Sequence, residues 1–236
     1  MANQTFLKLG VNYLGDHGLN LLEKPKIRNF VLNKAKKASE KGYQSNLQSG
    51  KYSPGECRDR YVINQAILSS ADRLLGNPKS VAPSYLKKVA DIMVKSILLE
   101  GGDVQKQQEF KALHGRRPPG LLTVSPTKAC NLKCIGCYAN SSGLAHEKLS
   151  WDVFDHVLDD ARNIFGNRFV VISGGEPFAY KDQGKDLLDM VAKHDDMFFM
   201  AYTNSLLIED KTAARMAELG NFSPAISVEG WREKTD

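Results

Sequence analysis

Apolar residues in the N-terminal half of the chain recur every three or four positions, which is the period of an amphipathic α-helix. Gly42 follows the first such segment and is expected to end it. Pro83 begins the third, where its fixed φ suits the first helical turn. The pattern predicts four helices, over residues 26–41, 58–75, 83–100 and 103–113.

After residue 120 the pattern changes to short, continuous apolar runs separated by helical segments. The runs are rich in Val, Ile and Phe and occupy residues 121–125, 168–173, 197–203 and 224–228. Helical spacing fills the intervals, over residues 150–165, 184–194 and 210–219. Strands that alternate with helices and are apolar on both faces are typical of a parallel α/β sheet or barrel. The sequence therefore predicts an α/β fold preceded by a mainly helical region.

The segment HGRRPPG, residues 114–120, separates the two patterns. Pro118 and Pro119 cannot continue a helix, and Gly120 frees the backbone, so the segment has the features of a linker. We expect a helical, basic domain over residues 1–117 and an α/β domain over residues 118–236.

A small polar or glycine-rich loop follows each predicted strand. The four loops begin at Ser125, Ser173, Thr203 and Ser227. The carboxyl ends of parallel strands meet at one edge of a sheet or barrel, and ligands bind at that edge. The four loops are therefore expected to form one site.

Composition narrows the class of protein. Hydrophobic residues make up 42% of the chain and charged residues 25%, as in soluble globular proteins. The apolar runs are far too short to span a bilayer, and the N-terminus lacks the basic segment that begins a secretory signal. We therefore expect a cytoplasmic protein without a membrane span.

Charge is divided unequally along the chain. Residues 1–120 carry 20 basic and 10 acidic side chains, whereas residues 121–236 carry 12 and 17. A basic half can provide a surface for an anionic partner. The basic residues are scattered rather than grouped, so we favour the alternative of a solvated, lysine-rich helical surface.

Three of the four cysteines, Cys130, Cys134 and Cys137, lie within eight residues. Clustered thiols in a chain of this type indicate metal binding rather than a disulfide framework. A zinc site would need a fourth ligand, which His146 or Cys57 could supply. Three thiolates on an iron–sulfur cluster would instead leave one iron without a protein ligand, and an open position is typical of a catalytic metal.

The segment CNLKCIGC after the first predicted strand, with SGGEP after the second, strongly resembles the radical S-adenosylmethionine (SAM) enzymes. TN and SVEG, which end the third and fourth strands, extend the resemblance over residues 121–236. The resemblance implies that Cys130, Cys134 and Cys137 bind a [4Fe–4S] cluster whose fourth iron is chelated by SAM. It also implies reductive cleavage of SAM to a 5′-deoxyadenosyl radical that abstracts hydrogen from a substrate, with an electron donor of the flavodoxin or ferredoxin type.

The same resemblance assigns the GGEP residues to the methionine end of SAM. Gly174 and Gly175 would let the backbone approach the cofactor closely, and their carbonyl groups would accept from its ammonium group. Glu176 would add negative charge near that group, and Pro177 would fix the turn.

Residues at the next two strand ends suit the ribose. Thr203 and Asn204 offer a hydroxyl and an amide, while Ser227 and Glu229 offer similar contacts to ribose or substrate. One departure concerns the adenine: family members often have an aromatic residue just before the third cysteine. This chain has Gly136 there and Tyr138 just after Cys137.

Two other functions remain open at this point. The chain could be an iron–sulfur or zinc binding module, although such a module needs none of GGEP, TN and SVEG. It could also be an inactive relative that keeps the site. Similar enzymes often act on peptides or cofactor precursors, so one of these is the expected substrate. The family's barrel usually has six strand–helix units, so we expect a partial barrel truncated after four strands, either a fragment or completed by another chain.

Overall fold

The structure is a computed structural model that describes residues 24–50, 52–77, 81–89, 91–92, 103–228 and 230. The described residues fall into two compact units, one up to Pro83 and the other from Ser84 onward. This division lies earlier in the chain than the linker at residues 114–120, and a domain boundary at that linker stays a prediction. Among the described residues, no helix combines the length and the apolar character needed to cross a bilayer.

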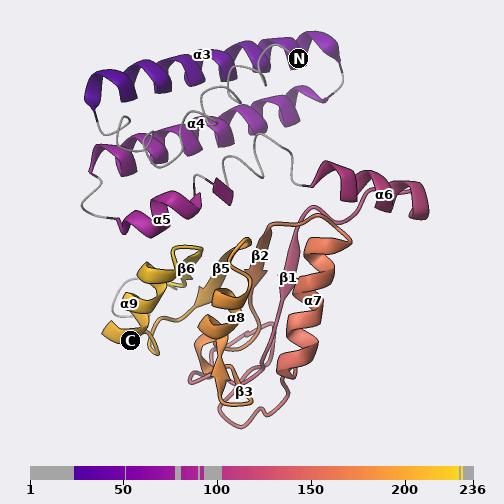
Figure 1. The fold of residues 1–236 in the computed structure, drawn as a ribbon, viewed down its shortest axis with the longest axis vertical. Helices are drawn as coiled ribbons and strands as arrows, with labels where there is room; N and C mark the ends of the chain where they lie inside the picture. The colour runs from indigo at the N-terminus through magenta and orange to yellow at the C-terminus, as the bar shows by residue number, and fades with distance from the viewer. Residues whose placement is uncertain are drawn as a thin grey trace. The chain divides into compact units, whose positions relative to one another are not determined.

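The first unit contains two long helices, α3 (Pro25–Ser49) and α4 (Pro54–Gly76), shown in Figure 1. The predicted end of α3 at Gly42 is wrong, because the helix continues to Gly50, whose φ of 62° ends it. A glycine within a helix costs only about 1 kcal/mol. Packing against α4, including the stacked rings of Tyr43 and Tyr61, accompanies this continuation.

Two shorter helices follow, α5 (Pro83–Lys88), which begins at the boundary between the units, and α6 (Val104–His114). The helix predicted over residues 83–100 is confirmed at its start, and residues 93–102 lie outside the described residues. Asp103 caps α6 by accepting a hydrogen bond from the Lys106 N–H at 3.1 Å. The Phe110 ring of α6 packs edge-on against Phe165, so α6 belongs to the α/β unit.

Four strands form one sheet in the order β1-β2-β5-β6, with every neighbouring pair parallel. This arrangement confirms the predicted parallel α/β sheet. Pro224 lies in β6, at the edge of the described sheet. A proline is tolerated in an edge strand because its missing N–H does not interrupt the hydrogen bonds between central strands. The strands are β1 (Leu122–Val124), β2 (Phe169–Ile172), β5 (Phe198–Thr203) and β6 (Phe222–Ile226).

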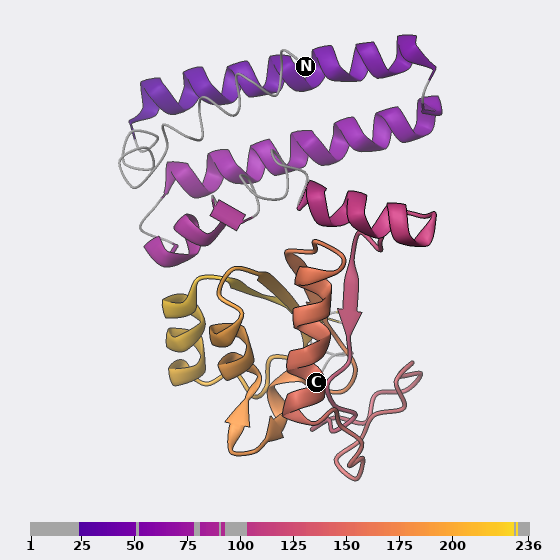
Figure 2. The same ribbon diagram turned by 45° about the vertical axis from the view of Figure 1, so that its right-hand side comes forward.

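Three helices, α7 (Trp151–Asn163), α8 (Leu187–Lys193) and α9 (Asp210–Leu219), follow the strands (Figures 1 and 2). They contribute to one apolar core with the sheet, whose fully buried members include Phe154, Leu158, Val170, Ile172, Met190 and Phe199. Ser150 caps α7, because its hydroxyl accepts a hydrogen bond from the Val153 N–H. Burial of the apolar core between the sheet and these helices is the main source of the unit's stability.

The helix predicted from residue 184 begins three residues later, at Leu187. A small hairpin of β3 (Lys181–Asp182) and β4 (Lys185–Asp186) precedes it. Both residues of its turn, Gln183 and Gly184, have positive φ, as a two-residue hairpin turn of type I′ requires. Asp186 then caps α8 through reciprocal bonds with Asp189, so the capping residue rather than the apolar spacing sets the start.

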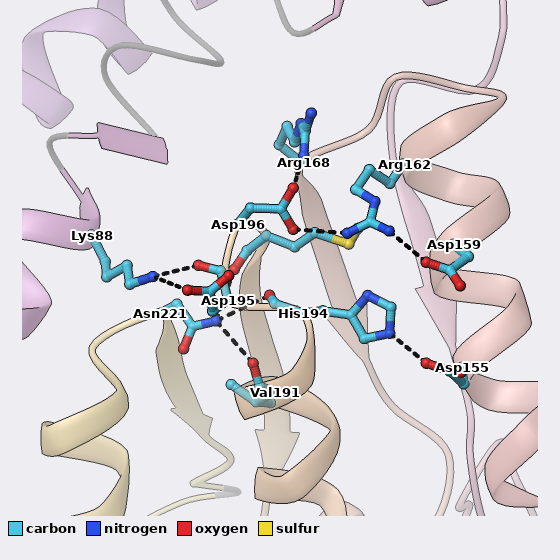
Figure 3. Close-up of polar contacts among 11 residues, drawn as sticks. Lys88, Asp155, Asp159, Arg162, Arg168, Val191, His194, Asp195, Asp196 and Asn221 are labelled. Atoms are coloured by element: carbon cyan, nitrogen blue, oxygen red, sulfur yellow. Dashed lines mark hydrogen bonds and ion pairs between the residues drawn. The ribbon is translucent and has the colours of Figure 1, made fainter.

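Polar side chains fasten the amino-terminal end of β5 to its neighbours (Figure 3). The buried Asn221 amide donates to three carbonyl groups, those of Val191, His194 and Met197, at 3.0–3.3 Å. Asp155 of α7 accepts a 2.9 Å hydrogen bond from Nε2 of His194. These contacts fix the end of the sheet opposite the loops that carry the candidate site.

Candidate active site at the carboxyl edge of the sheet

The loops that follow the four strands meet, as the sequence predicts. The Ser173 N–H donates to the Val124 carbonyl, and the Ser227 N–H donates to the Thr203 carbonyl, each at 2.9 Å. The first loop, residues 125–149, is the longest of the four and extends beyond the sheet in Figure 2. Chemistry-bearing residues from separate parts of the sequence therefore share one edge.

Backbone hydrogen bonds close the base of the cysteine loop, which we define as residues 125–149. The Leu149 N–H donates to Pro126, and the Lys128 N–H donates to Glu147, at 2.8 and 2.9 Å. Farther out, the Cys130 N–H donates to the Ser142 carbonyl at 3.2 Å. The first cysteine is thus the last residue of this ladder.

All three thiols of the loop are free, and their surroundings differ. Burial raises the pKa of the Cys130 thiol, an effect that the Leu132 N–H partly opposes. Hydrogen bonds from the backbone at Ser141 and Ala139 lower the pKa of the Cys137 thiol. The surroundings of Cys137 therefore favour the thiolate, which is the form that binds iron.

The donor set fits an iron–sulfur cluster in its chemistry, with three thiols on one loop at the site edge. No three His, Cys, Asp or Glu side chains among the described residues converge closely enough to hold a single metal ion. His146 is exposed on the same loop, and Cys57 is buried in α4 of the other unit. A buried, apolar position is the ordinary one for a lone cysteine.

The two glycines of GGEP lie directly against the cysteine loop. The Gly175 N–H donates to Thr127, and the Glu176 N–H donates to Ala129, at 2.8 and 2.9 Å. A Cβ atom on Gly175 would lie only 2.2 Å from the Ala129 carbonyl oxygen, and one on Gly174 2.8 Å from that of Thr127. The structure therefore explains both glycines by close packing of two loops, and their predicted approach to SAM stays a prediction.

Glu176 joins the end of β2 to the end of β5. Its carboxylate is buried and accepts from the Thr203 hydroxyl at 2.7 Å, the Asn204 N–H at 2.9 Å and the Phe178 N–H at 3.2 Å. Pro177 follows and begins the short 3₁₀ helix η3 (Pro177–Ala179). The Thr203 hydroxyl thus has a protein partner, and its predicted ribose contact stays a prediction.

The remaining predicted residues have different settings. The Asn204 side chain is part-buried at the edge, with its amide 2.8 Å from Oδ1 of Asn131 and 3.9 Å from the Cys130 sulfur. Ser227 is exposed after β6, and Glu229 lies outside the described residues. The roles of all three toward ribose or substrate stay predictions.

Two further residues at the edge were not predicted as site residues. Asn131 bonds to Asn204, and the Tyr138 hydroxyl lies 2.6 Å from Oγ of Ser173 and accepts from the Gly174 N–H at 3.1 Å. Each stands directly after a cysteine, which is the only signal for them in the sequence.

Residues 124–236 match the model of the radical SAM superfamily. This part of the chain, slightly less than half of its length, is similar to that superfamily. Members of the superfamily use a [4Fe–4S] cluster and SAM. The match covers the cysteine loop, GGEP and the ends of β5 and β6, so it includes every residue predicted to bind the cluster or SAM.

Individual relatives align with about half of the chain. The Fe-coproporphyrin III synthase of Methanosarcina barkeri is 34% identical over 111 residues, which are 47% of this chain and 27% of that protein. The mycofactocin maturase MftC of Mycobacterium ulcerans is 31% identical over 119 residues, 50% of this chain and 31% of that protein. This chain therefore aligns with less than a third of the length of either relative.

Among solved structures, the radical SAM domain is similar to SuiB of Streptococcus suis bound to the precursor peptide SuiA. The sequence identity is 25% and the TM-score 0.45. The aligned region covers 56% of this chain and 29% of SuiB.

Proposed function

We propose that the chain is a radical SAM enzyme that binds a [4Fe–4S] cluster through Cys130, Cys134 and Cys137. The observation that carries the proposal is the direct contact of the cysteine loop with the GGEP loop. Two backbone hydrogen bonds and two tightly packed glycines hold these motifs together. A module that used its metal for structure alone would have no need of this second loop beside the thiols.

The bound cluster and SAM would supply the chemistry, namely reductive cleavage of SAM to a 5′-deoxyadenosyl radical. The chain's own residues bind and orient. Backbone carbonyl groups at Gly174 and Gly175 would accept from the ammonium group of SAM. Glu176 would add negative charge near that group, and Pro177 would fix the turn. Thr203 and Asn204 would contact the ribose, and Ser227 and Glu229 would contact ribose or substrate. The Gly136 backbone would approach the adenine.

For the substrate we propose a peptide or a cofactor precursor. The two relatives described above are named for the maturation of mycofactocin and the synthesis of Fe-coproporphyrin III. A flavodoxin or ferredoxin would supply the electron in the cytoplasm. The six basic residues and one acidic residue of α3 fit the solvated, lysine-rich helical surface favoured above, with an anionic partner as the alternative.

Anaerobic reconstitution tests the function. The chain should take up about four irons and four sulfides, one cubane cluster, and with dithionite and SAM it should release methionine and 5′-deoxyadenosine. The control is the variant in which all three loop cysteines are Ala. Cluster uptake without SAM cleavage would favour a binding module or an inactive relative, and zinc in place of iron would overturn the cluster assignment.

A further inference from the structure

Asn131 and Tyr138 connect the cysteine loop to two different strand ends. Asn131 directly follows the first cysteine, and its Oδ1 accepts from Nδ2 of Asn204, after β5, at 2.8 Å. Tyr138 directly follows the third cysteine, and its hydroxyl bonds to Ser173 and Gly174, after β2. Hydrogen bonds therefore hold the outer part of the loop at two positions, one next to Cys130 and the other next to Cys137.

We propose that Asn131 and Tyr138 are positioning residues that orient Cys130 and Cys137 toward the SAM-binding edge. This role rests on the proposed function. Neither residue would touch iron through its side chain; each would act through the cysteine that precedes it.

Few other contacts orient the outer loop. The backbone ladder ends at the pairing of Cys130 with Ser142. Beyond it, the backbone hydrogen bonds are local: the Cys137 N–H donates to Cys134, and the Asn140 N–H donates to Cys137. Ile135 is fully exposed, so burial does not hold the tip. Polar side-chain contacts are the remaining means of fixing its direction.

The hydroxyl of Tyr138 is the part of this side chain that makes the connection. The residue is 78% exposed, so its ring contributes little buried area. Ser173, its partner, is itself fixed to the sheet through its N–H bond to Val124. The phenol accepts from the Gly174 N–H and is left free to donate to Ser173. Tyr138→Phe removes this connection and leaves the exposed ring.

The first experiment needs no cofactor. Amide hydrogen exchange at Gly174 is measured in the protein without cluster, for the wild type and Tyr138→Phe. Loss of one hydrogen bond should speed exchange there about fivefold. Tyr180→Phe is the matched control, because it loses the same atom from a buried ring whose hydroxyl has no hydrogen-bond partner among the described residues.

The second experiment measures SAM affinity after reconstitution. Tyr138→Phe and Asn131→Ala should keep the iron content of the wild type, while each raises the dissociation constant for SAM about fivefold, and the double variant about 25-fold. The change in the electron paramagnetic resonance spectrum of the reduced cluster on SAM addition reports binding. The exposed Asn163→Ala at the end of α7 is the control for Asn131.

The outcomes separate the two proposals. Unchanged exchange at Gly174 in Tyr138→Phe overturns the role of Tyr138. Unchanged SAM affinity, in a wild type that binds cluster and SAM, overturns positioning by the variant residue concerned. A wild type that binds neither cluster nor SAM overturns the proposed function, and this role with it, while the exchange result still shows whether the connection exists.

Discussion

The Thr203 hydroxyl donates a hydrogen bond of 2.7 Å to Oε1 of Glu176 and so joins the ends of two neighbouring strands. The contact is buried, and Glu176 follows β2 while Thr203 ends β5. A carboxylate that accepts several hydrogen bonds away from water is a rigid connector. Glu176, the acidic residue of GGEP, therefore holds the carboxyl ends of β2 and β5 together through buried hydrogen bonds.

Replacing Glu176 by Gln should destabilise the α/β unit by about 1–3 kcal/mol. The carboxylate accepts three hydrogen bonds, whereas the Gln amide must turn its NH₂ group toward at least one of the donors. Urea denaturation followed by circular dichroism measures the loss. The exposed Glu218→Gln in α9 is the control, and equal stability of the two variants would contradict the connecting role.

Replacing Gly175 by Ala should displace the cysteine loop and reduce cluster uptake to less than half of the wild-type value. The added Cβ would lie 2.2 Å from the Ala129 carbonyl oxygen, a distance that forces a backbone to move. Iron content after reconstitution is the measurement. Gly120→Ala is the control because a Cβ there meets nothing within 4 Å. Full iron content with a raised KM for SAM would instead support the predicted approach of Gly175 to the cofactor.

Much of the α/β unit can be predicted from the sequence because its patterns are strong and local. α9 has the predicted bounds, since Gly220 with a φ of 74° stops a clear helical pattern. The four strands are also predicted, because a short, continuous apolar run between two helices is typical of a buried parallel strand. The meeting of their loops follows from parallel topology alone.

The missed features depend on contacts between distant residues. The spacing of residues within one segment does not reveal that Gly175 packs against Ala129, or that Glu176 accepts a hydrogen bond from Thr203. The hairpin before α8 was missed because its strands have only two residues each, too few for an alternating pattern. α3 continues through Gly42, where packing outweighs the modest cost of glycine.

Asp155 should make the stability of the α/β unit depend on pH. Burial raises the pKa of Asp155, but hydrogen bonds from Lys193 and His194 outweigh burial and hold this pKa below its usual value. A lowered pKa in the folded state means that the ionised group stabilises the fold above the unfolded pKa of about 4. That stabilisation is lost as the pH falls through the folded pKa.

Asp155→Asn should therefore unfold more easily than the wild type at pH 7, by about 1–2 kcal/mol, with a difference that shrinks below about pH 4. Urea denaturation between pH 7 and pH 3 measures this difference. Glu218→Gln should show no comparable gap at any pH. A gap that stayed constant as the pH fell would mean that the Asp155 charge contributes nothing and that only its shape matters.

Cys134→Ala should abolish reductive cleavage of SAM, whereas Cys57→Ala should leave it within about threefold of the wild type. Cys134 is an exposed thiol of the cysteine loop, and its loss would leave a second iron without a protein ligand. Cys57 is buried in α4, and its removal should cost about 1 kcal/mol of stability through a small cavity. The measurements are 5′-deoxyadenosine release and iron content. Equal losses of both in the two variants would show that the ligands are misassigned, because a buried thiol in the other unit would then matter as much as one beside GGEP.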